Sequence, residues 1–339
     1  MNIAELIHPE DAKALKGLKN IPALPQVMEK IFQYGYDEIL WSENVTTNVR
    51  LSENQMPEIY NRLPPICERL GIPVPELYLQ MSPIPNAWTS GHNKIYIVLT
   101  LGLIRKIKGE ELDAVLAHEC GHIVCQHVLY TTLANTIFTF GDSMTDSLLG
   151  VIGNVAMKPI RQALIAWSRA SELSADRIAC IITSAETLSR ALVRLDMVPK
   201  YIADTINLQA WAEQGKDFEA LKNGTAWNKI VRWMSNSDAD HPYNPVRAYQ
   251  AMEWEKTSLC QQLKGTTCLQ LESNKPTTPT MPSIPSKESV AATVSQVSDN
   301  IKDKVDGLAK GFGSLSKDVS KLTKDVKVGS VFSKFNLKK

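Results

Sequence analysis

The chain lacks an export signal, a disulfide pattern and an excess of charge of either sign. Its first residues, MNIAELIHPEDAK, contain no basic segment followed by a long apolar run, so we predict no secretory signal and a cytoplasmic location. Six cysteines scattered through 339 residues do not form a disulfide framework and are expected to be reduced thiols. The formal net charge of +1 gives no reason to expect a nucleic-acid partner.

The sequence also has no clear transmembrane segment. The most apolar region, residues 128–157, is divided by Asp142 and Asp146. Each half is shorter than the roughly 20 apolar residues that span a bilayer. We therefore expect this region to form buried helices of a soluble domain.

Changes in composition divide the chain into five parts. We expect an N-terminal helical extension (1–50), a globular domain (51–271), a proline-rich linker (272–288), an amphipathic helical tail (289–328) and a flexible C-terminus (329–339). Prolines recur every third residue in the linker, at positions 276, 279, 282 and 285. This spacing indicates an extended polyproline II spacer, although a ligand for a binding groove has the same pattern.

The expected tail carries one narrow apolar stripe. Its eleven positions advance 36 residues in ten steps, a mean of 3.6, which is the period of a straight helix rather than of a two-stranded coiled coil. Such a helix has marginal stability by itself, so we expect it to lie on a surface that covers its apolar stripe. Two hypotheses stay open: peripheral membrane contact through residues 289–328, and a disordered tail.

A candidate metal site lies in AVLAHECGHIVCQHV, residues 114–128. On a helix, His118 and His122 are four residues apart and share one face, so both imidazoles can bind the same ion. Glu119 lies about 100° round the helix, beside the ion, where a carboxylate can activate a water molecule. We expect Gly121 to leave room at the face between the ligands. The pattern predicts zinc bound to an apolar helix.

Two neighbours of this motif are expected to be outside the metal site. His127 would lie about 180° round the helix from His118, so we expect it to face solvent or to pack. Cys125 lies on the ligand face, one turn beyond His122. A ligand that far along the helix axis would strain a tetrahedral site, so we interpret Cys125 as a small apolar wall residue.

A catalytic zinc ion needs a third protein ligand and an open position for water. Glu172 and Asp176, in WSRASELSADRIACII, are four residues apart on a second predicted helix. Glu172 can supply the ligand, and Asp176 can accept a hydrogen bond from a ligand histidine. Spacing alone leaves open the alternative that these carboxylates form a charged stripe with Arg169 and Arg177.

Four segments together resemble a known family. LDAVLAHECGHI (112–123) and RASELSADRIA (169–179) are similar to the zinc metallopeptidase family that includes the heat-shock protease HtpX and the CaaX prenyl-protein endopeptidase. The segment before the zinc helix (70–104) and DHPYNPVRAYQ (240–250) also resemble that family, so the likeness covers roughly residues 50–255. Integral members have membrane helices between the two motifs, where this chain has residues 128–157.

The resemblance implies the roles of the motif residues. His118, His122 and Glu172 would bind one Zn²⁺ per chain, and Glu119 would be the general base. The metal-bound water would lose its proton to Glu119 and attack a peptide carbonyl, and Glu119 would pass the proton to the leaving amine.

The segment ahead of the zinc helix would form the substrate groove. Residues 76–81 and 94–100 alternate as strands do, and a loop is expected to join them. In the family, a strand edge beside the zinc pairs with the extended substrate backbone. Asn86, Ala87 and Trp88 would flank this groove, although Trp88 is equally well interpreted as a packing residue.

The resemblance also brings His241 to the metal site. A histidine there could donate a hydrogen bond to the negative oxygen of the tetrahedral intermediate. Alternatively, it could bind the zinc and hold the enzyme inactive, or lie near a helix N-terminus without a catalytic role. Arg247 is expected to anchor this segment on Asp176 or on another carboxylate.

These expectations combine into one hypothesis. The chain is predicted to be a mainly helical α+β metallopeptidase of the zincin type, with a small β-sheet beside the zinc helix. It would hydrolyse polypeptides in protein quality control or processing. The alternative is a non-catalytic, zinc-stabilised scaffold that acts through its tail on a membrane or partner. Glu119 distinguishes the two, because a structural zinc site has no use for a free glutamate.

Overall fold

The computed structural model describes residues 2–33, 35–91, 94–147, 150–196, 199–225 and 243–269. The chain divides into two compact units, Met1–Pro282 and Ser283–Lys339. His241 and the expected linker, tail and C-terminus lie outside the described residues.

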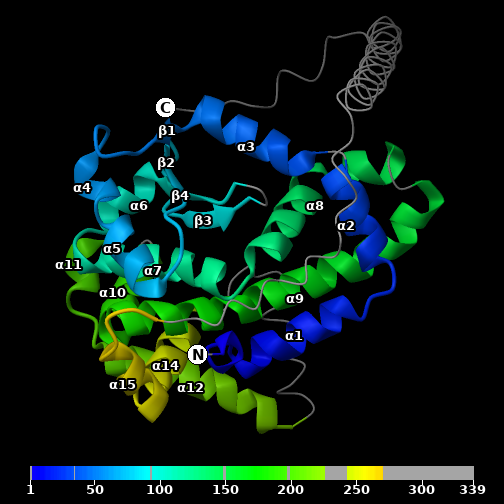
Figure 1. Cartoon of the computed structure of the whole chain (residues 1–339). Coiled ribbons are helices and arrows are strands. Elements are labelled where there is room, and N and C mark those ends of the chain that lie inside the picture. The colour runs from blue at the N-terminus through cyan, green and yellow to red at the C-terminus, as the bar shows by residue number, and fades with distance from the viewer. Residues whose placement is uncertain are drawn as a thin grey trace, which may run out of the picture. The chain divides into compact units, whose positions relative to one another are not determined.

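The described elements of the first unit are mostly helices, with one four-stranded sheet (Figure 1). This confirms the expected mainly helical α+β class. In chain order they are η1 (Ile3–Glu5), α1 (Pro9–Lys19), α2 (Leu24–Gln33), α3 (Tyr36–Thr47), β1 (Val49–Arg50), α4 (Pro57–Tyr60), α5 (Leu63–Leu70), β2 (Glu76–Gln80), β3 (Ala87–Ser90), β4 (Tyr96–Thr100), α6 (Leu101–Lys106), α7 (Glu110–Val124), α8 (Val128–Ser147), α9 (Gly150–Ile182), α10 (Ala185–Leu195), α11 (Lys200–Ala203), α12 (Leu208–Ala220), η2 (Leu221–Asn223), α14 (Asn244–Glu255) and α15 (Ser258–Lys264).

The sheet has the strand order β1-β2-β4-β3. β2 and β4 are parallel, with Leu77 opposite Ile97, and they correspond to the two strands expected from the sequence. The connection between them, which was expected to be a loop, contains a further strand. β3 pairs antiparallel with β4 and forms one edge of the sheet. Four residues, AWTS, are too short for an alternating pattern to distinguish a strand from a loop.

The two faces of the sheet pack against different partners, as the two-residue period of a strand requires. Leu77 and Leu79 of β2 belong to the main core, which also contains apolar side chains of α5, α7, α9 and α10. Tyr78 and Val98 lie on the other face, where Trp41 of α3 packs against them. The sheet is therefore covered by helices on both faces, and α7 lies on the main-core side.

Helices α7 and α9 pack closely at Gly121. A Cβ atom at this position would lie 2.9 Å from the Cα atom of Ala175 and 3.0 Å from its carbonyl oxygen. The missing side chain of Gly121 therefore makes room for the backbone of α9. The room expected beside His118 and His122 is therefore filled by α9, the helix that carries Glu172.

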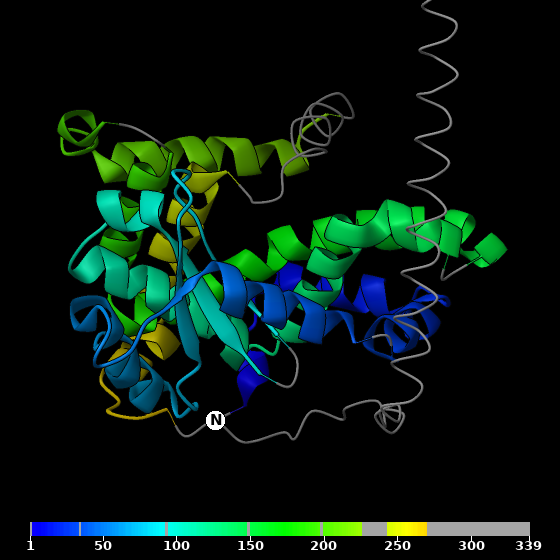
Figure 2. The same ribbon diagram turned by 90° about the horizontal axis from the view of Figure 1, so that it is seen from above.

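The N-terminal helices belong to the first unit, Met1–Pro282. α1 lies along α9 (Figures 1 and 2). Leu18 of α1 and Val27 of α2 share a second core with Ile137 of α8 and Trp167 of α9. Helices α1 and α2 of the N-terminal segment thus pack against α8 and α9.

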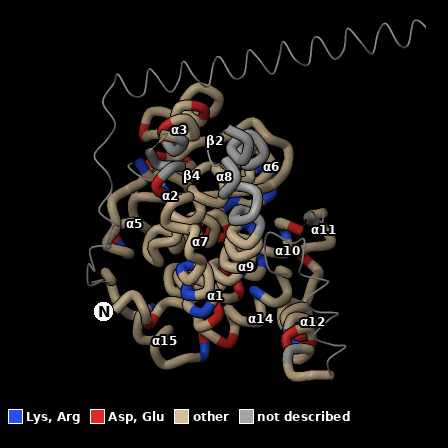
Figure 3. The backbone as a smooth tube through the Cα atoms, turned by 90° about the vertical axis from the view of Figure 1, so that its right-hand side faces the viewer, with Lys and Arg blue, Asp and Glu red and all other residues tan. Residues whose placement is uncertain are grey.

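Acidic and basic residues are interspersed along the described helices (Figure 3), in agreement with the net charge of +1. Among the helices that the structure describes, none has both the length and the apolar character for a bilayer crossing.

The contact between α7 and α9 leads to a stability prediction. Gly121→Ala should lower the free energy of unfolding by about 1–3 kcal/mol, because the new methyl group forces the helices apart. Gly17→Ala is the matched control. Gly17 lies within α1 with open space around its Cα, so the change should stabilise the protein by about 0.5–1 kcal/mol. Urea denaturation followed by circular dichroism measures both changes, and a gain in both variants would contradict the close packing.

Candidate active site

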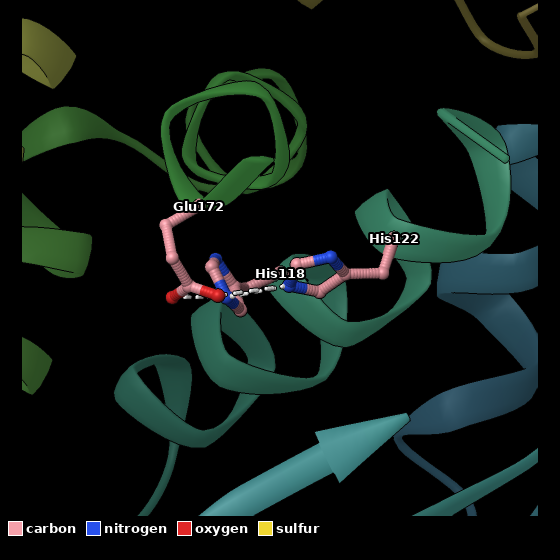
Figure 4. A group of neighbouring side chains, drawn as sticks. All are labelled: His118, His122 and Glu172. Atoms are coloured by element: carbon pink, nitrogen blue, oxygen red, sulfur yellow. Dashed lines mark hydrogen bonds and ion pairs between the residues drawn. The ribbon is translucent and has the colours of Figure 1, made fainter. Parts of the chain in front are cut away.

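Three side chains that can bind a metal meet between α7 and α9 (Figure 4). α7 supplies His118 and His122, and α9 supplies Glu172. The two Nε2 atoms are 3.3 Å apart. Oε2 of Glu172 lies 3.4 Å from Nε2 of His118, and Oε1 lies 3.3 Å from Nε2 of His122. The helical spacing of four residues places both imidazoles on one face, and the second helix supplies the carboxylate.

The size of this triangle fits zinc. A tetrahedral zinc ion has ligands at about 2.0–2.1 Å, so two of its ligand atoms are separated by about 3.3–3.4 Å. The separation of the two Nε2 atoms, 3.3 Å, lies within this range. Each Nε2 atom also has one oxygen of Glu172 at a similar distance, Oε2 beside His118 and Oε1 beside His122. All three side chains are buried, with relative exposures of 7%, 7% and 5% for the two histidines and the glutamate. Two imidazoles and one carboxylate form a donor set that can hold a zinc ion.

Asp176 and Arg247 contact the side chains of this triangle. Nδ1 of His118 lies 2.9 Å from Oδ1 of Asp176, which places the ring proton on Nδ1 and leaves Nε2 free to bind a metal. Arg247 of α14 donates two hydrogen bonds to Asp176, at 2.8 and 2.7 Å. Its Nη1 atom lies 3.2 Å from Oε2 of Glu172. The guanidinium thus holds both carboxylates of α9 in place.

The buried charges shift one another's pKa values. Burial raises the pKa of Asp176, but the Arg247 cation outweighs this effect and lowers it. Burial disfavours the charged form of Arg247, but Asp176 and Glu172 raise its pKa. The carboxylates of Glu119, Glu172 and Asp176 interact with one guanidinium, and they outnumber the positive charges of the site even when His118 is protonated. Such a site attracts a divalent cation.

Thr89 of β3 holds the carboxylate of Glu119. Its hydroxyl lies 2.6 Å from Oε2 of Glu119 and 3.1 Å from the carbonyl oxygen of the same residue. Both residues are buried. The sequence analysis missed Thr89 because it lies in the segment that was expected to be a loop. The available signal was its position in the NAWTS segment ahead of the zinc helix.

The predicted groove residues line a cleft of about 730 Å³ that also contains the ligand triangle. Asn86, Ala87 and Trp88 lie on its wall, with the strand β3. The backbone of Asn86 pairs with Thr100 at the end of β4. Trp88 is half-buried and packs against the aromatic cluster of Tyr78 and its neighbours, so it both packs and lines the cleft.

His127 packs, which is one of the two outcomes expected from the sequence, but it packs against the ring of His122 rather than on the far side of the helix. Helix α7 ends at Val124, and Gln126 adopts a left-handed conformation with φ of 60°. The chain therefore turns back, and His127 is buried with its Nδ1 atom 3.0 Å from Nδ1 of His122. The angle of about 180° assumed that the helix continues. Three histidines within ten residues were the only signal of this contact.

Cys125 caps the end of α7 and is buried. Burial raises the pKa of its thiol, so the thiolate that a metal requires is disfavoured. It does not belong to the described group of ligands. Arg177, which the alternative hypothesis placed in a charged stripe, donates instead to the carbonyl groups of Leu6 and Ile7.

Comparison with known proteins agrees with this geometry. The model of peptidase family M48 matches residues 53–255, more than half of the chain. The chain belongs to peptidase family M48. This membership and the metallopeptidase names of its relatives identify it as a metalloprotease, and the family resemblance noted from the motifs is confirmed.

Two relatives show the extent of the similarity. The plastoglobule-localized metallopeptidase 48 of Arabidopsis thaliana is 32% identical over 255 residues, which cover 74% of this chain and 72% of the relative. A protease HtpX homolog of Pelotomaculum thermopropionicum is 29% identical over 205 residues, which cover 52% and 72%. The crystal structure of S. mikatae Ste24p aligns over 71% of this chain and 64% of its own, with 17% identity and a TM-score of 0.38.

The electrostatics of the triangle predict that zinc uptake releases a proton. Burial lowers the pKa of His118, but Glu172 and Asp176 outweigh it and raise that pKa to about 10 in the metal-free protein. Below this pKa a proton occupies the position of the metal. The apparent zinc affinity should therefore increase about tenfold per pH unit between about pH 7 and pH 9, with about one proton released per ion. Calorimetry in buffers of different ionisation enthalpy measures both quantities, and an affinity independent of pH would contradict the prediction.

Proposed function

We propose that the chain is a zinc-dependent endopeptidase in which His118, His122 and Glu172 hold the metal and Glu119 is the general base. The observation that carries the proposal is that two Nε2 atoms 3.3 Å apart meet the Glu172 carboxylate, whose two oxygens lie 3.4 and 3.3 Å from them, in the same cleft as Glu119. Zinc, when bound, would lower the pKa of a water molecule toward about 7 and polarise a carbonyl oxygen.

The protein's own part in the reaction is proton transfer by Glu119. Oε2 of its carboxylate accepts a hydrogen bond from the Thr89 hydroxyl. This bond would orient the carboxylate and leave Oε1 to receive the proton of the attacking water. The same oxygen then returns the proton to the leaving amine. Since Glu119 does not belong to the ligand triangle, a purely structural zinc site would not explain it.

The edge of β3 is the proposed binding place for the substrate backbone. β3 pairs with β4 on one side, and no described strand pairs with its other side. An extended peptide can add to such an edge through main-chain hydrogen bonds, with little demand on sequence. Asn86, Ala87 and Trp88 would flank the bound peptide, since they line the cleft. We propose polypeptides as the substrate class and protein quality control or processing as the role.

The segments outside the described residues complete the proposal. His241 would donate a hydrogen bond to the developing negative oxygen, or bind the metal in an inactive state. The tail, residues 289–328, would contact a lipid surface peripherally. One relative is named plastoglobule-localized, which supports a lipid-associated location for this chain.

The function is tested by Glu119→Gln. The amide cannot accept a proton, so peptide cleavage should fall by about 10²–10⁴-fold while one zinc ion per chain is retained. Glu110→Gln is the matched control, because Glu110 is an exposed residue in the first turn of the same helix. Zinc content and the cleavage rate of an unstructured peptide are measured together. A Glu119→Gln variant with zinc and full activity would refute the proposal.

Two substitutions of Thr89 test whether its hydrogen bond to Glu119 contributes to the reaction rate. Thr89→Val keeps the shape of the side chain but removes the hydroxyl, so kcat should fall by roughly tenfold, the effect of about 1.4 kcal/mol. Thr89→Ser keeps the hydroxyl and should retain most of the activity. KM should change little in both variants, because the lost contact orients Glu119. Equal kcat values for the valine and serine variants would show that Thr89 does not position the base.

A further inference from the structure

A second chain of buried hydrogen bonds starts at His122 and ends on the N-terminal helix. Nδ1 of His122 lies 3.0 Å from Nδ1 of His127, and Nε2 of His127 lies 2.9 Å from Oδ2 of Asp11. The relative exposures of His127 and Asp11 are 1% and 0%. Residues from α7, from the turn before α8 and from α1 are thus joined behind the ligand triangle.

The protons in this chain can be assigned in one consistent way. His122 can bind a metal through Nε2 only if that atom carries a lone pair, so its ring proton is on Nδ1. Nδ1 of His127 must then accept this proton, because two N–H groups cannot face each other. The proton of His127 is therefore on Nε2 and is donated to Asp11, which as a carboxylate only accepts.

The carboxylate of Asp11 is itself held in position. Nε1 of Trp167 donates to Oδ1 at 3.1 Å, and the hydroxyl of Ser174 donates to Oδ2 at 2.6 Å. Both donors come from α9, the helix that also carries Glu172. Asp11 therefore cannot turn away from His127 without leaving buried donors without an acceptor, which costs about 1–3 kcal/mol for each group.

We propose that His127 and Asp11 are positioning residues of the metal site, which direct the Nε2 lone pair of His122 at the ion. The inference rests on the proposed function, since it takes His122 as a ligand. The two ligand histidines are then oriented by two different carboxylates. Asp176 on α9 accepts the hydrogen bond of His118 directly. Asp11 on α1 acts on His122 through the imidazole of His127. The N-terminal helix is thereby a part of the site.

Asp11→Asn tests the direction of the proton chain. The N–H of Trp167 can only donate, so it holds the amide oxygen and turns the NH₂ group toward His127. His127 must then accept at Nε2 and carry its proton on Nδ1. This reverses the contact with His122 and places a proton on its Nε2 atom. Zinc affinity should fall by about 10–100-fold, as for the loss of other groups that orient a ligand.

Two substitutions of His127 test the same contact independently. His127→Leu removes the acceptor for Nδ1–H of His122 and should weaken zinc binding by about 10–100-fold. His127→Asn places an amide oxygen close to the position of Nδ1 and should recover much of the affinity. Ser189→Ala is the control, because it removes a fully buried hydroxyl that bonds to Ala185 on α10, outside this network.

The readouts are the zinc dissociation constant, from competition with a chromophoric chelator, and the visible spectrum of the Co²⁺-substituted full-length protein. The melting temperature of each metal-free variant is recorded alongside. The proposal requires weaker zinc binding and an altered Co²⁺ spectrum in Asp11→Asn and His127→Leu, with recovery in His127→Asn and wild-type affinity in Ser189→Ala.

Two results would overturn the inference. One is wild-type zinc affinity in Asp11→Asn and His127→Leu. The other is an equal loss of affinity in Ser189→Ala, which would show a general effect of stability. His118→Ala separates this test from that of the function. If that variant keeps the wild-type affinity, the ligand set is wrong, whereas loss of zinc there with intact binding in Asp11→Asn removes only the positioning role.

Discussion

The close approach of α7 and α9 at Gly121 is the contact on which the site depends. The donor atoms of one zinc site must lie about 3.3 Å apart, and two imidazoles on one helix cannot complete the set alone. The backbone of α9 has to come close enough for Glu172 to reach both Nε2 atoms. A Cβ atom at residue 121 would meet the backbone of Ala175 at about 3 Å, so only glycine allows this distance.

The contact between α7 and α9 brings several buried carboxylates together, and each of them needs a polar partner. A buried carboxylate without a partner is costly, and each carboxylate of the proposed metal site has one. Arg247 holds Asp176 and Glu172, and Thr89 holds Glu119. The ion pair of Arg247 and Asp176 is not evidence of stability by itself, since burying charges has a large desolvation cost. It orients ligands and leaves net negative charge for a cation.

The edge strand β3 contacts Glu119 and also lines the cleft. Thr89 faces Glu119, while its neighbours in β3 line the cleft, so one four-residue strand positions the proposed base and borders the proposed substrate groove. An error in the placement of β3 would therefore disturb both proposed roles together. The rigid pairing of β3 with β4, whose residues are buried, keeps this strand in register.

The sequence by itself determined the local chemistry of this protein. The spacing of His118 and His122 and the pair Glu172 and Asp176 could be recognised because helical periodicity needs no knowledge of distant residues. The sheet strands β2 and β4 and the helical class followed from alternation and composition in the same way. The tertiary structure alone decided which elements meet. It placed Asp11 against His127, more than a hundred residues away, because a left-handed residue ends α7 and turns the chain back. It also made β3 a strand and turned Gly121 toward α9, since pairing and helix contacts depend on residues that are remote in the chain.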